Sequence, residues 1–188
     1  MQYKLLRVFL IVTFINEFSS YFMKLYDINT LINYNLYCYF RFVLLSFIYS
    51  RFFSKYSIVG YTIRSFYVLT IVLFFLNIFL YNGFSKVHTI YLNTGSLFVI
   101  ILCLCRFYTI LASDNPDSPY SYPFFWISTG FFFFFLMIIP SLGLINLLIS
   151  QKMDMAMQSL IITRSMSILL YLFISIDYFI QCRRLKLK

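Results

Sequence analysis

The sequence predicts an all-α protein, a polytopic bundle of six transmembrane helices with both termini in the cytoplasm. Of its 188 residues, 62% are hydrophobic and 11% are charged, and the mean hydropathy is +0.85. A soluble domain of this length would be about half apolar and about a quarter charged, so the composition excludes an ordinary aqueous globule. The apolar residues also form runs of about 20, the length that a helix needs to cross about 30 Å of hydrocarbon.

Six such runs follow one another with short connections. They cover about residues 5–23, 31–53, 62–82, 89–112, 124–150 and 156–181. No connection is long enough for a soluble domain, so we expect a single integral membrane domain over residues 1–188. The runs are continuous and do not alternate every second residue, which disfavours a lipid-exposed barrel. The first run follows Lys4 and Arg7, as in a signal peptide, but no A-x-A site comes after it, so we expect a retained helix.

The basic residues indicate the orientation of the bundle. There are 15 Lys and Arg against 6 Asp and Glu, a net charge of +9. With both termini inside, nine basic residues lie near the inner face and three lie outside, which fits the positive-inside rule. The nine are Lys4, Arg7, Arg51, Lys55, Arg64, Arg183, Arg184, Lys186 and Lys188, and the three are Lys24, Lys86 and Lys152. Because these residues sit at segment ends, we expect the lipid bilayer as partner and no nucleic acid.

Two opposite charges fall at matching depth in the first two runs. Glu17 lies 12 residues after Leu5, and Arg41 lies 12 residues before Phe53. At 1.5 Å per residue, both are about 18 Å from the inner boundary. Ionisable groups inside spans are costly and either pair or serve a function. The depth predicts a midplane ion pair, which is either a structural salt bridge or a ligand or proton site.

Three further charges lie inside the predicted spans. Arg106 and Asp177 are both about 8–9 Å above the inner face, so Arg106 either pairs with Asp177 or extends its guanidinium to the cytoplasmic headgroups. Arg164, in the outer half of the last run, has no acid at the same depth in this arrangement. We therefore interpret Arg164 as a candidate anion or lipid headgroup contact.

The last two runs also carry polar and helix-breaking residues. A hydroxyl stripe recurs at intervals of four in the last run, and it is formed by Ser159, Thr163, Ser167, Tyr171 and Ser175. Small hydroxyl residues at this spacing favour close helix packing with interhelical hydrogen bonds, over the alternative of a lined pore. Pro140 and Gly143 predict a kink or break in the fifth run.

Motifs that would identify an enzyme are missing from the sequence. The single histidine, His88, excludes histidine clusters, and there is no phosphate-binding glycine loop, no G-x-S-x-G and no acidic run for Mg²⁺. The four cysteines fall in or at the edge of apolar runs, which does not support a disulfide framework. We expect a non-enzymatic protein without a metal or a cofactor.

Several stretches occur in an order that resembles a known family. They are Glu17 with Tyr21, Ile28–Tyr37, Leu92-Asn93-Thr94, Arg106-Phe107-Tyr108 and Phe125-Trp126-Ile127-Ser128-Thr129-Gly130. The chain resembles a family of uncharacterised multi-pass membrane proteins of Bacteroidetes, many of them encoded beside two-component regulators. Two departures are an additional helix that members carry before the acid-bearing one, and Glu in members at the position of Arg41.

The resemblance implies a bacterial inner membrane and a regulatory neighbourhood, without supplying a reaction. Together with the short loops and the missing catalytic motifs, it favours a membrane sensor or signalling partner that associates with another membrane protein or a sensor kinase. The alternative is a small transporter or channel subunit, which Glu17, Arg41 and the break at Pro140 would serve.

Overall fold

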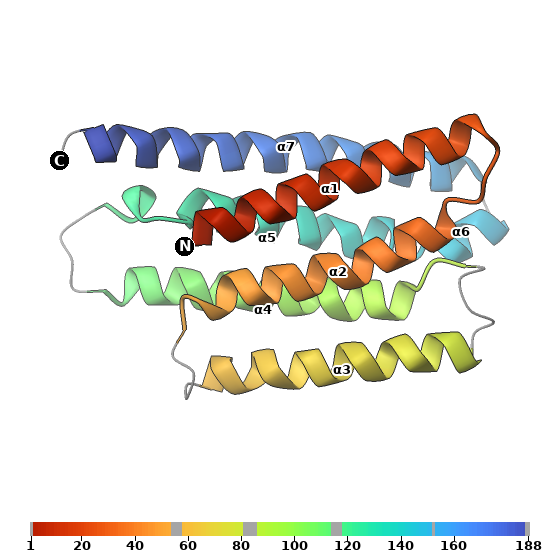
Figure 1. Ribbon diagram of the computed structural model, residues 1–188, viewed down its shortest axis with the longest axis horizontal. Helices are drawn as coiled ribbons and strands as arrows, with labels where there is room; N and C mark the ends of the chain where they lie inside the picture. Colours follow the sequence, from red (N-terminus) through yellow and green to blue (C-terminus); the bar gives the residue numbers. More distant parts are fainter. Residues whose placement is uncertain (1, 54–57, 81–85, 114–117, 152, 187–188) are drawn as a thin grey trace. The chain divides into compact units, whose positions relative to one another are not determined.

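The computed structural model describes residues 2–53, 58–80, 86–113, 118–151 and 153–186. The described chain is helical, with one 3-10 turn and no strand. Its elements are α1 (Gln2–Leu25), α2 (Leu31–Ser50), α3 (Ile58–Leu80), α4 (Thr89–Leu111), η1 (Pro119–Ser121), α5 (Phe125–Ser141), α6 (Ile145–Gln151) and α7 (Met153–Lys186). Figure 1 shows them in chain order. The prediction of an all-α helix bundle is confirmed.

Within the described ranges, six segments are long and apolar enough to cross a membrane. They indicate a multi-pass membrane protein. The predicted runs match them closely, with differences at the ends. The third helix begins at Ile58 and passes through Gly60, where we expected a connection. The last helix has 34 residues and extends beyond the apolar run at both ends, because backbone hydrogen bonds continue a helix into polar sequence whereas hydropathy marks only its apolar part.

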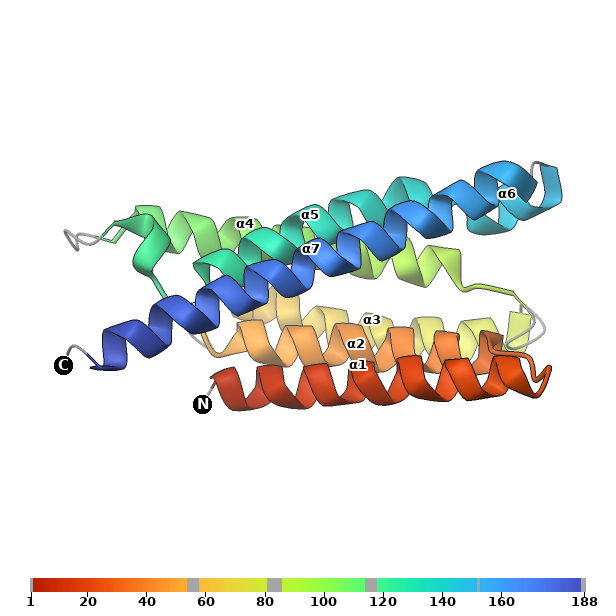
Figure 2. The ribbon, with the colours of Figure 1, turned by 90° about the horizontal axis from the view of Figure 1, so that it is seen from above.

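The described residues form two compact units, Met1–Gly95 and Ser96–Lys188, whose boundary lies within α4. The first unit holds α1, α2, α3 and the first turns of α4. Figure 2 shows α1 and α2 side by side in this unit, as an antiparallel hairpin. The prediction of one membrane domain stays a prediction, and each unit is described by itself.

The turn between α1 and α2 is fixed by backbone hydrogen bonds. The amide of Ile28 donates to the carbonyl of Met23 at 2.8 Å, and that of Asp27 donates to Lys24 at 3.2 Å. This pair of bonds is a Schellman motif, and it places Asp27 in the left-handed region with φ 53°. The side chain of Asn29 accepts the amide of Leu31 at 2.9 Å. The hairpin therefore has a defined reversal, five residues long, which sets α1 and α2 antiparallel.

Polar side chains join the two helices of this hairpin. The hydroxyls of Thr13 and Tyr37 lie 2.8 Å apart. The amide of Asn33 donates to Ser20 Oγ at 2.9 Å and to the carbonyl of Asn16 at 3.4 Å. Hydrogen bonds of this kind are the usual polar contacts between transmembrane helices. They occupy successive turns on one face of α1.

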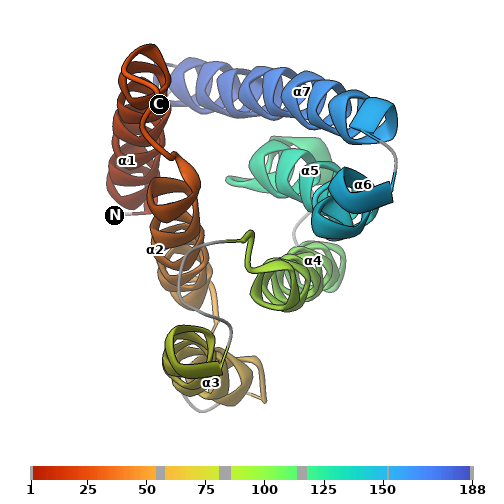
Figure 3. The same ribbon diagram turned by 90° about the vertical axis from the view of Figure 1, so that its right-hand side faces the viewer.

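The second unit is organised around α5 and α7, which pack along each other in Figure 3. A small residue permits this approach, because a Cβ added at Gly130 would lie 2.9 Å from Cβ of Phe173 and 3.0 Å from Cδ1 of Leu170. Trp126, one turn earlier, stacks on the Phe173 ring with centroids 5.9 Å apart. The Phe125–Gly130 stretch that the sequence singles out therefore forms part of a helix-packing surface.

The fifth span contains two helices. α5 ends at Ser141 and α6 begins at Ile145, and the amides of Leu142 and Gly143 both donate to the carbonyl of Ile138, at 2.8 and 3.1 Å. Pro140 has no amide proton to donate to the carbonyl four residues before it, and its ring crowds that turn, so the hydrogen-bond ladder is weakened just before α5 ends. The interruption lies where Pro140 and Gly143 predict a kink or break.

Candidate functional site

Glu17 and Arg41, the predicted midplane pair, lie in different surroundings. The Glu17 side chain is exposed on α1, whereas Arg41 on α2 is only 5% exposed. Among the described residues no ion pair joins the two side chains. The described structure therefore differs from the prediction of a midplane ion pair between Glu17 and Arg41.

The physical reason is rotation about the helix axis. The face of α1 that meets α2 carries Thr13, Asn16 and Ser20. Successive residues of an α-helix are about 100° apart, so Glu17 turns away from the face that Asn16 occupies. Counting residues gives the depth of a side chain along a span and leaves its direction undetermined.

Arg41 is held among aromatic side chains. Its guanidinium carbon lies 4.9 Å from the centroid of the Phe42 ring and 5.6 Å from that of Tyr37. These distances are within the range of cation–π attraction, which strengthens where the cation is desolvated. The buried side chains of Cys38, one turn earlier on α2, and of Tyr91, whose ring meets that of Phe42 edge-on at 5.4 Å, lie close to it. We call these five residues the Arg41 cluster.

A stacked aromatic layer joins α2 to the start of α4 beside the Arg41 cluster. The rings of Tyr39 and Tyr91 stack with centroids 4.0 Å apart, and Tyr91 meets Phe42 edge-on at 5.4 Å. A Cβ at Gly95 would lie 2.5 Å from two atoms of the Phe42 ring. Gly95 thus permits the close approach of the two helices, and the sequence analysis did not identify it.

A polar network at the same end of α2 was also missed. Asn35 donates from Nδ2 to the carbonyl of Lys86 at 2.8 Å and accepts the amide of His88 at 3.2 Å. The Tyr39 hydroxyl lies 3.4 Å from Nδ1 of His88. Asn35 and His88 are 1% and 7% exposed. The only available signal was Asn35 itself, an amide within an apolar run, because the partner groups are mostly backbone atoms.

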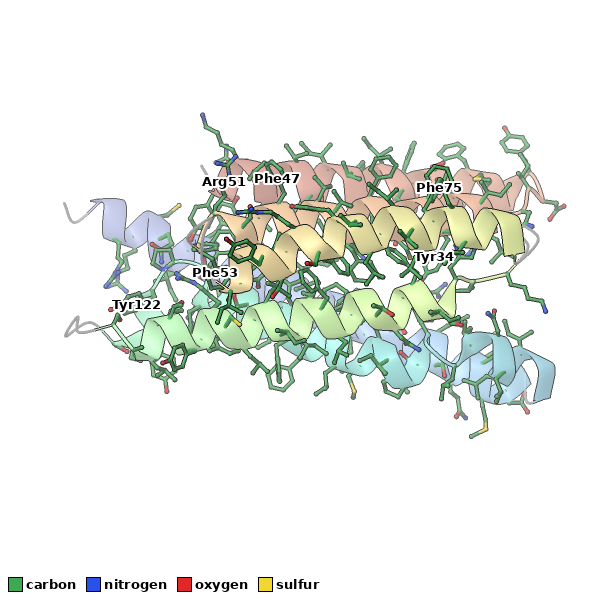
Figure 4. All side chains as sticks on the ribbon, turned by 90° about the horizontal axis from the view of Figure 1, so that it is seen from below. Tyr34, Phe47, Arg51, Phe53, Phe75 and Tyr122 are labelled. Atoms are coloured by element: carbon green, nitrogen blue, oxygen red, sulfur yellow. The ribbon has the colours of Figure 1, made fainter. Side chains whose placement is uncertain are left out.

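Figure 4 labels three side chains on α2 and at its end. Tyr34 lies toward the start of the helix, Phe47 lies toward its end, and Arg51 is the residue that directly follows the helix. The Arg51 guanidinium lies 5.3 Å from the centroid of the Phe47 ring. Arg51 is exposed, as expected for a basic residue at the membrane boundary. Arg41 within α2 and Arg51 at its end therefore occupy contrasting environments, one buried and one exposed.

Arg106 makes a contact that neither sequence alternative included. Its Nη2 donates to the carbonyl of Pro123 at 2.9 Å, in the segment that connects α4 to α5. Arg184 Nη2 donates to Ser121 Oγ at 2.9 Å in the same segment, and Trp126 Nε1 donates to the carbonyl of Tyr120 at 3.0 Å. Three elements of the second unit thus fix the Pro119–Pro123 segment. Asp177 is 1% exposed on α7, and its pairing with Arg106 stays a prediction.

The hydroxyl stripe changes environment along α7. Ser159 is buried, and Thr163 donates to Ser141 Oγ on α5 at 3.2 Å. Further along, Tyr171 is 42% exposed and Ser175 is exposed, with Ser175 donating to the Tyr171 carbonyl at 2.8 Å. Ser167 donates to the carbonyl of Thr163 at 3.0 Å. The first half of the stripe thus makes an interhelical hydrogen bond through Thr163, and the stripe turns toward a more exposed side further along, because positions four apart advance about 40° around the helix.

Arg164 is exposed on α7, next to Thr163. Glu17 on α1 and Arg64 on α3 are also exposed charges that lie inside candidate spans and away from their ends. Other charges inside spans, Arg41 and Asp177, are buried, and Arg106 bonds to a backbone carbonyl. The described residues contain no group of three or more His, Cys, Asp and Glu that could hold a metal ion.

No family model, no curated protein and no solved structure matches the chain.

Proposed function

We propose that this chain is a non-enzymatic multi-pass membrane protein that works by association with other membrane proteins, as a sensor or signalling partner. The observation that supports this most is the position of Glu17. It lies three residues from the centre of the Tyr3–Leu25 span, it is exposed, and it faces away from the side of α1 that meets α2.

A carboxylate in that position is unfavourable in lipid. On insertion scales, a charged residue at the centre of a helix costs about 2.5–3.5 kcal/mol. The side chain of glutamate is too short to reach the headgroups from about 10 Å below them, unlike that of arginine or lysine. A polar partner at the same depth would offset this cost. Exposed aromatic rings lie beside Glu17, namely Phe14, Phe18 and Tyr21, which are 68%, 55% and 61% exposed.

The resemblance to Bacteroidetes membrane proteins suggests where this association takes place. We propose a bacterial inner membrane as the location and a sensor kinase as one partner. Co-purification from native membranes that repeatedly recovers no kinase or other signalling protein would count against the signalling part of this proposal.

The association itself is tested by photo-crosslinking from α1. A photoreactive residue at Phe18 is expected to capture protein in native membranes, and Glu17→Gln is expected to reduce that capture severalfold. Ile71, which is 57% exposed on α3, provides the matched control position for a photoreactive residue. Adducts from Phe18 that contain only lipid, at the level found from Ile71, would refute association through α1.

A small transporter or channel subunit is the second candidate. It is favoured by the Arg41 cluster, in which a buried guanidinium lies among hydroxyl and thiol groups inside a span. Purified protein in liposomes should then conduct ions or solutes, and Arg41→Gln should abolish the flux while Arg51→Gln, an exposed arginine on the same chain segment, should not. Absence of flux across a range of pH and ions would remove this candidate.

A further inference from the structure

We infer that one occupant of the α1 face is a second copy of this chain, which supplies Arg164 as the partner of Glu17. This inference rests on the proposed function, because it names the protein that meets Glu17. It makes the chain self-associating, with an ion pair inside the membrane between α1 of one copy and α7 of the other.

Elimination among the basic side chains points to Arg164. Most of the described lysines and arginines lie at helix ends or in connections. Inside the spans, Arg41 is buried among aromatic rings and Arg106 donates to the Pro123 carbonyl.

Arg64 is exposed on α3, but it precedes the centre of the Ile58–Leu76 span, whereas Glu17 follows the centre of its own span. The first and third spans run in the same direction, so Arg64 and Glu17 lie on opposite sides of the midplane. Arg164 is exposed in the interior of a span and makes no hydrogen bond or ion pair with the described residues. Among the described residues, Arg164 is therefore the exposed basic group inside a span that lies on the same side of the midplane as Glu17.

The depths of the two charges agree. Glu17 lies three residues after residue 14, the centre of the Tyr3–Leu25 span, and Arg164 lies five residues before residue 169, the centre of Asp154–Arg184. At 1.5 Å per residue, the offsets are about 4.5 and about 7.5 Å. The first and sixth spans run in opposite directions, so both offsets are toward the same side of the membrane. A difference of about 3 Å is within the reach of an arginine side chain.

The surfaces around the two charges also suit each other. On α7, Ile161 and Ile168 flank Arg164 at intervals of three and four, and they are 62% and 64% exposed. On α1, Phe14 and Tyr21 flank Glu17 at intervals of three and four. Residues at this spacing lie on one side of a helix, so each charge is centred in an apolar face. Two such helices can pack with their charges opposed and their apolar residues in contact.

A charge exchange between two differently tagged copies tests the pair. One copy carries Glu17→Arg and therefore has two positive charges at the relevant positions. The other copy carries Arg164→Glu and has two negative charges. We expect each variant to associate with itself about tenfold more weakly than the natural chain, and the two variants to associate with each other within about threefold of it. An ion pair inside one chain would not be restored by mixing, so mixed recovery is specific for pairing between copies.

Two controls keep the result interpretable. A copy that carries Glu17→Gln together with Arg64→Glu, which moves the added carboxylate to an exposed arginine on α3, should give no recovery with the Glu17→Arg copy, because neither copy then has a carboxylate at position 17 or 164. The neutral variants Glu17→Gln and Arg164→Gln should each weaken self-association about tenfold while their melting temperatures in detergent stay close to that of the natural chain. These neutral variants test the pair even if a charge reversal prevents insertion.

Failure of this inference differs from failure of the proposed function. If the natural copies do not associate, or if folded copies with exchanged charges do not recover association, the second-copy inference is overturned. A photoreactive residue at Phe18 that then captures a different protein would leave the proposed function intact. Capture of lipid alone would overturn both. If Arg164 contacts lipid phosphate groups and not Glu17, a photoreactive residue beside it on α7 will capture lipid, and Arg164→Gln will leave self-association unaltered. That result also overturns the inference.

Discussion

Substitution of Gly95 by alanine tests the packing of α2 against α4. A Cβ at position 95 would lie 2.5 Å from Cδ2 and Cε2 of Phe42 and 2.7 Å from Cζ. Real Cβ contacts of this length essentially do not occur, so the ring or the helix has to move. The ring has little room, because Phe42 is fully buried and meets Tyr91 edge-on at 5.4 Å. Gly95→Ala is therefore expected to destabilise the protein.

Two opposing effects set the magnitude. Alanine is favoured over glycine in a helix by about 1 kcal/mol. Overpacking of a well-packed core costs about 1–3 kcal/mol, and the three short contacts to a fixed ring place Gly95→Ala at the upper end of that range. The net expectation is a loss of about 2 kcal/mol in the free energy of unfolding. This corresponds to a change of about 30-fold in the ratio of folded to unfolded protein.

The assay is reversible unfolding in detergent, followed by circular dichroism or by tyrosine and tryptophan fluorescence. Thr94→Ala is the matched control, since it places alanine one residue away without adding an atom against Phe42. Combining Gly95→Ala with Phe42→Leu should recover at least about 1 kcal/mol relative to the sum of the single effects, because removal of the ring removes the clash. If Gly95→Ala is as stable as the natural chain or more stable, or if the two changes add strictly, α2 and α4 do not approach each other in this way.

Three further predictions follow from the described contacts. Gly130→Ala should lower the free energy of unfolding by about 1–2 kcal/mol, after the helix preference for alanine is subtracted, because its Cβ would meet Cβ of Phe173, which cannot rotate away; equal melting temperatures would contradict this packing. Asp27→Gly should stabilise the hairpin slightly, by up to about 1 kcal/mol, since glycine adopts positive φ without steric cost; chemical unfolding measures it, and a loss of stability would count against the Schellman turn. Glu17→Gln and Arg41→Gln should have additive effects on thermal stability, and a coupling above about 0.5 kcal/mol would show that the two side chains meet after all.

The sequence by itself determined the spans and their number. Their length and hydropathy are local properties, so residues such as Leu31 and Thr89 mark the starts of helices in both the prediction and the structure. Pro140 could be interpreted in the same way, because a missing amide proton acts on its own helix whatever surrounds it. The sequence also shows which charged residues lie inside the spans, but it does not show whether each of them is buried or exposed.

Only the tertiary structure decided which side chains meet. Glu17 and Arg41 share a depth, yet Glu17 turns away from the face on which Thr13, Asn16 and Ser20 meet α2. Rotation about a helix axis depends on how neighbouring helices pack, and a hydrophobic sequence with apolar residues on all sides gives no direction for it. The same holds for Gly95, whose importance comes from the ring of Phe42, 53 positions away in the chain. Membrane helices find each other through close packing and a few hydrogen bonds, and those contacts exist only once the helices are assembled.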